Sequence, residues 1–446
     1  MLIVALLAPA ALAGPEAARV REVVPLLASA EVDVRNKAQW ELLGLIGEAK
    51  SEAAAKSTAL DVIQEIARAS SEAKLGVDPK FFAAQLKRVK TVKPKAWVDH
   101  FLAAPEDVVY LAGTVPNRFR GAACINEIAV PVGNCIARFI QRTEEERLRA
   151  RGITTPPGMV LVPAGEFVTG SSQREIDYCI KQMEGSEGWT KYPRWRTSDI
   201  AEYRSEVPRR LASTGTFYID AHELTNEQYR GFCAASGYEP PTSTHLGVGQ
   251  SGGFEPFFAF FAWRGSPPTY PSGHGDRPFI FANLARGEAF GTWAKKRLPN
   301  EIEWEKAARG IDGRVWPWGS SFDKQLAQTP ERQNQASAYA SDYLPVVSLP
   351  EGQSPWGCVQ IAGNAWEVAL PSEEPEADRE DGSRTTTAEA RPKCVATSKG
   401  GDAAHSVSHA GTNSRAARRK IWDSDIAAAS YATFRFVRGV ERQDEE

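Results

Sequence analysis

A pair of prolines near residue 156 constrains the fold of this chain more than any other feature. The residues before it, 142–152 (RTEEERLRARG), are charged and typical of a helix end, and residues 153–158 (ITTPPG) follow directly. Proline lacks a backbone N–H and clashes with the preceding helical turn, so no helix continues through this segment. The sequence therefore predicts two architectures joined by a linker over residues 152–157.

The part before the linker is predicted to be helical. With 446 residues the chain exceeds the usual size of one hydrophobic core, so two domains are expected. Residues 17–151 are rich in Ala, Leu, Glu, Lys and Arg, with apolar residues at helical spacing, as in VRNKAQWELLGLIGEA. This pattern predicts a small all-α domain.

The part after the linker has a different composition. Ten of the twelve tryptophans follow residue 158, among short helical segments and Gly- and Pro-rich stretches. Capping boxes at Thr225 with Gln228 and at Asn300 with Glu303 begin two helices. We therefore expect an α+β domain with much irregular structure over residues 158–440, followed by an acidic tail, residues 441–446.

The first residues, MLIVALLAPAALAG, have the features of a signal peptide. They form an apolar run that ends in the small-x-small pattern Ala11-Leu12-Ala13. The run is too short to span a bilayer, so no stable membrane span is expected. No Lys or Arg precedes it, and a buried first helix is the alternative. We expect residues 1–16 to direct a secreted or periplasmic protein.

Charge and cysteine content argue against nucleic-acid binding and against a thiolate zinc site. The net charge is −3 with both signs interspersed, which offers no basic surface for nucleic acid. Six cysteines show no CxxC pair, so a thiolate zinc site is not expected. Exported cysteines can form disulfides, with Cys124 and Cys135 the first pair to consider. Buried free thiols are the alternative.

Five sequence blocks resemble, in order, those of the formylglycine-generating-enzyme (sulfatase-modifying factor) family. The blocks are GMVLVPAGEFVTGS, FYIDAHELTNEQYRGF, RLPNEIEWEKAARG with VWPWG, SPWGCVQIAGNAWEVAL, and KGG with SRAARR and TFRFVRG. An ordered set over residues 158–440 is far more specific than any single block. The resemblance implies the elaborated C-type-lectin-like fold of that family for this part of the chain.

The resemblance also implies a calcium site. In the family it forms around the GNxWE turn, from two backbone carbonyls, a side chain three residues before the glycine, and the glutamate. The matching positions are Gln360, Gly363, Ala365 and Glu367. Oxygen-only ligation on a loop suits Ca²⁺, a hard cation. The alternative is that Asn364 and Glu367 only stabilise a tight turn by hydrogen bonds.

The catalytic positions depart from the family pattern. The family's oxidases use two cysteines, five positions apart, whose thiolates bind Cu(I) and activate O₂ to oxidise a substrate cysteine. Counted from Gly400-Gly401 and back from Arg415, these positions are His405 and Ala410. Since neither is a cysteine, formylglycine generation by the known mechanism is not expected.

Two histidines in the same segment suggest a metal site of another kind. His405 and His409 are four residues apart, a spacing that shares one face on a helix or a strand. With Asp402 they would form a His-His-carboxylate site for zinc, copper or iron. Solvated side chains explain the same pattern. One alternative function is therefore a metal-dependent oxidase of this family with a histidine-based metal, in sulfatase maturation or related cysteine oxidation.

The composition of residues 402–414 (DAAHSVSHAGTNS) favours a binding role. Small and polar residues fill the segment, between blocks that keep the family pattern. Arbitrary exposed residues on a fixed scaffold are typical of a binding module. We expect an exported, calcium-stabilised protein whose catalytically divergent domain binds a protein, peptide or other ligand at this surface. A second alternative is a variable protein of a diversity-generating retroelement, since those proteins share this fold and vary this region.

Overall fold

The computed structural model describes most of both predicted parts of the chain. The described residues are 16–47, 49, 51–92, 108–109, 127–184, 190, 193–241, 263–333, 343–372, 396–401, 415–422 and 432–440. The predicted signal peptide, apart from residue 16, and the acidic tail lie outside them. No helix within these ranges combines the length and the apolar character needed to cross a membrane.

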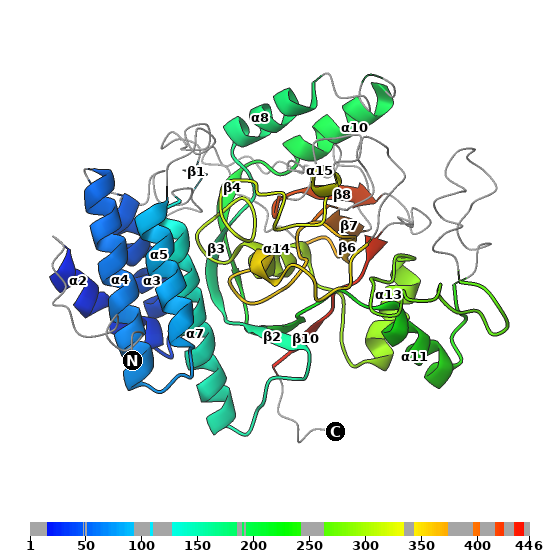
Figure 1. Cartoon of the computed structure of the whole chain (residues 1–446), viewed down its shortest axis with the longest axis horizontal. Coiled ribbons are helices and arrows are strands. Elements are labelled where there is room, and N and C mark those ends of the chain that lie inside the picture. The colour runs from blue at the N-terminus through cyan, green and yellow to red at the C-terminus, as the bar shows by residue number, and fades with distance from the viewer. Residues whose placement is uncertain are drawn as a thin grey trace, which may run out of the picture.

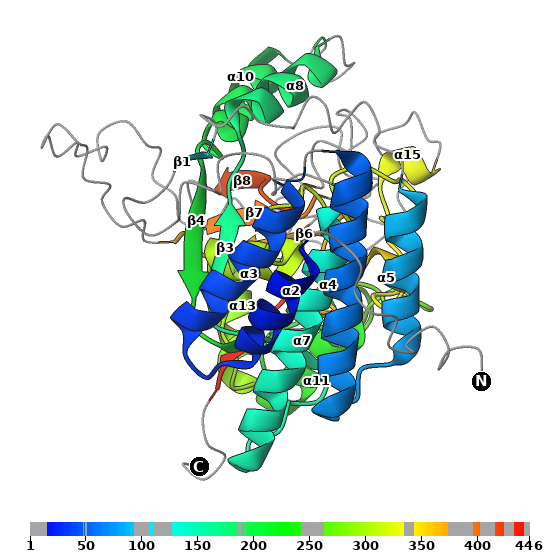
Figure 2. The same cartoon turned by 90° about the vertical axis from the view of Figure 1, so that its left-hand side faces the viewer.

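The N-terminal part is a bundle of helices, as predicted. Its elements are α2 (Ala17–Val23), η1 (Val24–Ala28), α3 (Val32–Gly47), α4 (Glu52–Glu72), α5 (Pro79–Thr91) and α7 (Ala129–Ala150). Helix α4 packs against α3, α5 and α7, and Figures 1 and 2 show these helices side by side at one end of the molecule. The proline segment follows α7 directly.

The C-terminal part mixes short strands and helices with much irregular chain. Its helices are α8 (Gln173–Met183), α10 (Pro193–Arg204), α11 (Asn226–Ser236), α13 (Leu284–Trp293), α14 (Glu301–Arg309), α15 (Pro330–Gln333) and η5 (Pro350–Gly352). This confirms the predicted α+β class with a helical N-terminal region. Both capping boxes are present, and α11 ends at Gly237 with φ 75°.

Three small sheets of the described residues organise this part, and the first also includes a short strand from before the linker. The first has the order β1 (Val108–Val109), β4 (Arg209–Thr214) and β3 (Gly165–Thr169), and the second β10 (Val437–Gly439), β5 (Phe217–Asp220) and β2 (Met159–Val162). The third has the order β8 (Arg419–Trp422), β7 (Ala396–Lys399), β6 (Trp366–Ala369) and β9 (Ala432–Thr433). In Figure 1 the sheets surround α14 at the centre.

The hydrophobic core is continuous between the two parts. One cluster of buried side chains contains Ile136 and Ile140 of α7 together with Phe217 of β5 and Trp304 of α14. Polar contacts join the parts as well: the Gln141 amide donates to the carbonyls of Leu161 and Trp356 at 2.7 and 3.0 Å. The linker therefore separates two kinds of secondary structure that share one interior.

A second core consists mainly of aromatic rings and lies under α11 and α13. Tyr229 stacks on Phe279 with ring centroids 3.8 Å apart, and Phe290 packs on Phe436 at 5.1 Å. Large flat side chains fill space between irregular segments with few conformational degrees of freedom. This explains why the tryptophan- and phenylalanine-rich half of the chain folds with so little regular structure.

Candidate functional site

Segment 402–414 lies outside the described residues, which stop at Gly401, two residues after β7, and resume at Arg415. Asp402, His405, His409 and Ala410 therefore lie outside the described residues, and their proposed roles stay predictions. What the structure does describe is how both ends of the segment are held. We call the residues that hold them the anchor network: Ser171, Glu175, Glu202, Glu206, Glu305, Lys399, Arg415 and Arg418.

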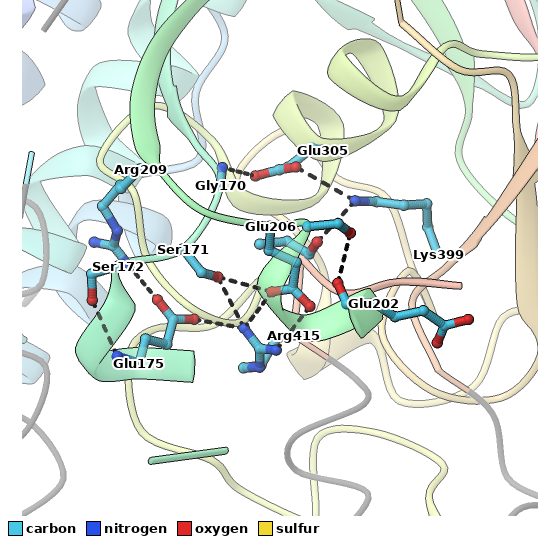
Figure 3. A network of polar contacts seen from close by, with 12 residues as sticks. Gly170, Ser171, Ser172, Glu175, Glu202, Glu206, Arg209, Glu305, Lys399 and Arg415 are labelled. Atoms are coloured by element: carbon cyan, nitrogen blue, oxygen red, sulfur yellow. Dashed lines mark hydrogen bonds and ion pairs between the residues drawn. The ribbon is translucent and has the colours of Figure 1, made fainter. Parts of the chain in front are cut away.

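Arg415, the first described residue after the segment, is held by two carboxylates. Its Nη1 lies 2.8 Å from Glu175 Oε1, 2.8 Å from Glu206 Oε2 and 3.0 Å from Ser171 Oγ. None of the three charged side chains is exposed. Figure 3 shows the three partners converging on the guanidinium. A buried charge keeps its ionised form only with partners of this kind.

Local structure places Glu175 for this contact. Ser172 accepts a hydrogen bond from the Glu175 backbone N–H at 3.2 Å, which begins α8 and sets Glu175 in its first turn. Glu175 Oε2 also accepts from Arg209 Nη2 at 2.8 Å. Burial favours a higher pKa for Glu175, but Arg209 and Arg415 outweigh it and hold that pKa below its ordinary value.

Lys399 holds the other end of the segment. Its Nζ lies 3.4 Å from Glu305 Oε2 and donates to the carbonyl of Ala417 at 3.3 Å. The second contact joins the residue before Gly400-Gly401 to the chain that follows the segment. Arg418 completes the set, with Nη2 2.9 Å from Glu202 Oε2. Both ends of segment 402–414 are thus fixed by buried ion pairs.

The GNxWE turn lies beside the anchor network. The Gly363 N–H donates to the Gly400 carbonyl at 2.7 Å, and Gly363 has φ 84°. A Cβ there would lie 2.6 Å from the Gln328 carbonyl oxygen, so only glycine fits. Asn364 Nδ2 donates to Glu223 Oε2 at 2.7 Å. The predicted turn therefore exists, and it contacts the chain just before segment 402–414.

The predicted calcium positions Gln360, Gly363, Ala365 and Glu367 lie in or next to this turn. Gln360 is 3% exposed, and neither atom of its amide has a partner among the described residues. Glu367 accepts from Arg435 Nη2 at 2.7 Å and from Trp304 Nε1 at 2.7 Å, so its charge is already balanced. A buried amide oxygen without a donor fits a cation that accepts neutral oxygen ligands, as Ca²⁺ does.

Transition metals fit less well within the part that the structure describes. No group of three or more His, Cys, Asp or Glu side chains there is placed to hold a metal ion. An ion at Gln360, Gly363, Ala365 and Glu367 would have oxygen ligands only. This donor set suits calcium and gives no soft ligand for copper.

A second buried carboxyl group, which no sequence pattern predicted, contacts this turn. Glu223 is 1% exposed and accepts from Asn364 and from the Ala365 N–H, the latter at 3.1 Å. Burial raises its pKa well above the ordinary value, and the nearby charge of Glu367 adds to the shift. The one sequence signal for it was its position in the block ELTNEQ, beside the capping box of Thr225 and Gln228.

The described cysteines are buried free thiols. These are Cys135, Cys179, Cys233 and Cys358. The pairing of Cys135 with Cys124 is therefore wrong, and the free-thiol alternative holds for these four. Burial raises the pKa of Cys179 to about 12 and that of Cys358 to about 11, which disfavours the thiolate that binds copper. Cys124 and Cys394 lie outside the described residues.

Comparison with known proteins places this geometry in a family. A family model described as "Sulfatase-modifying factor enzyme 1-like domain" matches residues 144–440, beginning inside α7. This confirms the resemblance and the predicted fold class. The "Formylglycine-generating enzyme" of Bos taurus is 27% identical over 248 residues, covering 48% of this chain and 57% of that protein. The chain thus spans little more than half of that relative.

Two further proteins are similar. The "Inactive C-alpha-formylglycine-generating enzyme 2" of Mus musculus is 26% identical over 251 residues, covering 50% of this chain and 72% of that protein. Among solved structures, PvdO from Pseudomonas aeruginosa aligns with 20% identity and a TM-score of 0.41, over 63% of this chain and 93% of that chain.

Proposed function

This chain belongs to the family of sulfatase-modifying factor enzyme 1-like domains, and from that premise we propose that it is a binding protein rather than a formylglycine-generating oxidase. The observation that carries the proposal is the anchor network. Lys399 before segment 402–414 and Arg415 and Arg418 after it are fixed by buried ion pairs. Such a frame holds its position whatever residues the segment contains, which suits a surface that presents a ligand-binding segment.

The residues at the family's catalytic positions support this proposal. His405 and Ala410 stand where the oxidases have cysteines, and alanine supplies no metal ligand or redox group. The described thiols are buried, with raised pKa values. A relative whose name includes "Inactive" is 26% identical to this chain, so similarity at this level does not imply the oxidase activity.

We also propose that calcium stabilises the anchor network and the turn beside it. Gln360 and Glu367, with the carbonyls of Gly363 and Ala365, would hold the ion. Gly363 bonds to Gly400, so an ion in this turn would stiffen the chain just before segment 402–414. Calcium from an extracellular medium would saturate the site in a protein exported by residues 1–16.

A peptide oxidation assay tests the enzyme alternative. Purified full-length protein is loaded in turn with Cu(I), Fe(II) and Zn(II) and incubated with a Cys-x-Pro-x-Arg peptide in air. Mass spectrometry then reports aldehyde formation, and elemental analysis reports bound metal. We expect neither aldehyde nor stoichiometric transition metal. Metal uptake with aldehyde formation, both lost in His405→Ala, would establish the histidine-based oxidase instead.

A cross-linking experiment tests the binding role. A photoreactive amino acid is placed at residue 409, and a control carries it at Arg230, which is exposed on α11. Both proteins are irradiated in the secreted or periplasmic fraction of the producing cells. We expect a discrete adduct from residue 409 and none from residue 230. Equal labelling from both positions would overturn the proposal.

The retroelement alternative has its own test in the DNA. It requires a neighbouring reverse-transcriptase gene and a near-repeat of the codons for residues 402–434. Their presence would assign the binding segment to a diversifying cassette. Their absence leaves a binding protein with one fixed ligand.

A further inference from the structure

A cavity of about 540 Å³ lies where α7 meets the C-terminal part of the chain. Its lining includes Arg138, Gln141, Arg142 and Glu145 of α7, together with Trp356 of the C-terminal part. These helix positions are three or four residues apart, so they share one face of α7. Figure 1 shows α7 running beside β2. The volume is in the range of small-molecule sites.

Gln141 presents an unfilled acceptor at this cavity. Its side chain is 2% exposed, and its Nε2 donates to Leu161 O at 2.7 Å and to Trp356 O at 3.0 Å. Two carbonyl acceptors fix the orientation of the amide, because a flipped amide would set oxygen against oxygen. Its Oε1 has no partner among the described residues. A buried acceptor of this kind is unfavourable unless a ligand or water donates to it.

Arg138 gives the cavity an uncompensated positive charge. Among the described residues its guanidinium forms no ion pair, its Nε is buried without a partner, and its Cζ lies over the Phe81 ring at 5.4 Å. Arg142, one turn further along α7, is paired with Glu145 at 2.7 Å. The charges of that pair cancel, and Arg149, which also lines the cavity, is paired with Glu146, so Arg138 carries the one charge without an ion-pair partner among the described residues of the lining.

We propose that this cavity binds a small organic carboxylate that also carries a hydrogen-bond donor. The planar fork of Arg138 matches a carboxylate, and the donor of the ligand would fill Gln141 Oε1. Met159 and Trp356 supply apolar contact for the ligand's carbon skeleton. A dianion such as phosphate fits less well, because Glu145 also lines the cavity and only one charge is uncompensated.

The test uses thermal melting and calorimetry of the full-length chain. The probes are hydroxy- and amino-carboxylates of three to nine carbons, the amide of each acid, each acid without its hydroxyl or amino group, and inorganic phosphate. We expect at least one hydroxy- or amino-carboxylate to raise the melting temperature. Its amide and phosphate should not, and the acid without the donor should bind about tenfold more weakly. Failure of every carboxylate, or equal binding of an acid and its amide, would overturn the proposal.

Variants locate the binding in this cavity. Arg138→Gln removes the uncompensated charge and should weaken binding at least tenfold, while Arg21→Gln on the exposed side of α2 should leave it unchanged. Thr154→Trp fills the cavity from its exposed rim and should abolish binding even if Arg138→Gln fails to fold. Binding that survives Thr154→Trp would place the ligand elsewhere and refute the assignment.

Discussion

Arg415 and Glu206 form a two-pronged ion pair in the protein interior. Arg415 Nη1 lies 2.8 Å from Glu206 Oε2, and Nη2 lies 3.1 Å from Oε1. Glu206 also accepts from Ser171 Oγ at 3.0 Å, so the pair joins the chain after β3, the chain before β4 and the end of segment 402–414. The guanidinium of Arg415 therefore connects three segments of the chain within the anchor network.

Replacing that guanidinium should destabilise the whole fold. Arg415→Met leaves Glu175 and Glu206 buried with less positive charge, and we expect the free energy of unfolding to fall by about 3–5 kcal/mol. Urea unfolding followed by circular dichroism measures this loss. Arg230→Met, which breaks the exposed pair with Glu227, is the matched control and should change little. Equal effects of the two substitutions would contradict the anchoring role.

Substitution of Trp304 should test the link between the anchor network and the GNxWE turn. Trp304 donates to Glu367 at 2.7 Å while Lys399 Nζ lies 5.6 Å from its ring centroid. Trp304→Phe keeps a ring and removes the donor, and we expect a loss of about 1–3 kcal/mol in urea unfolding. Trp293→Phe serves as control, because Trp293 is 47% exposed. A Trp304→Phe protein as stable as the wild type would show that Arg435 alone satisfies Glu367.

The raised pKa of Glu223 predicts a stability that falls with rising pH. A carboxyl with a folded pKa above its unfolded value of 4.5 contributes stability below pH 4.5, and this is lost as pH rises through the folded pKa. Glu223→Gln removes the titration. We expect the melting temperature of the wild type to drop relative to this variant over the range above pH 4.5. Parallel melting curves across that range would mean that Glu223 is ionised throughout.

The lowered pKa of Lys306 predicts the opposite pH dependence, a stability that rises with rising pH. Burial, with the charge of Arg35, lowers its pKa to about 7, while its Nζ donates to Pro163 O, Gly165 O and Thr214 Oγ1. A lysine with a lowered folded pKa contributes stability above its unfolded pKa of 10.5, and this is lost as pH falls through 7. The wild type should therefore gain stability over Lys306→Met from pH 7 to about pH 10. A constant difference would show that the hydrogen bonds keep the ammonium charged.

Calcium removal tests the proposed ion in the turn. If calcium binds Gln360, a chelator should lower the melting temperature. Calcium at about a hundred times its dissociation constant should raise the free energy of unfolding of the calcium-free protein by about 2.7 kcal/mol. Gln360→Asn keeps the amide oxygen and should keep the response, while Gln360→Leu should lose it. A wild-type protein indifferent to calcium would refute the site, and a response that survives in Gln360→Leu would move it elsewhere.

Local features of the fold could be predicted from the sequence because their partners are close in the chain. The capping boxes Thr225 with Gln228 and Asn300 with Glu303 need only three residues' separation, and both are present. The GNxWE turn is equally local, since Gly363 and Asn364 adopt positive φ within it. The ordered family blocks supplied the rest of the expected architecture.

The anchor network could not be predicted in the same way. Glu175 and Arg415 are 240 positions apart, and no pattern in the sequence marks one carboxylate among many as the partner of one arginine. The same holds for Glu223, whose importance depends on Glu367 lying near it. The pairing of Cys135 with Cys124 failed for a related reason, because a short spacing along the chain says nothing of burial.

Because the core is continuous, the proline linker does not separate the two independently folding domains that its composition suggests. Trp40 of α3 donates to Glu166 of β3 at 2.7 Å, and α7 packs against β2 and shares a buried cluster with Trp304 of α14. A protein cut at the prolines would keep all five family blocks and expose the apolar surface on which they rest. Heating should therefore melt both parts in one cooperative transition, and the N-terminal helices are as much a part of the folding unit as the domain that gives the family its name.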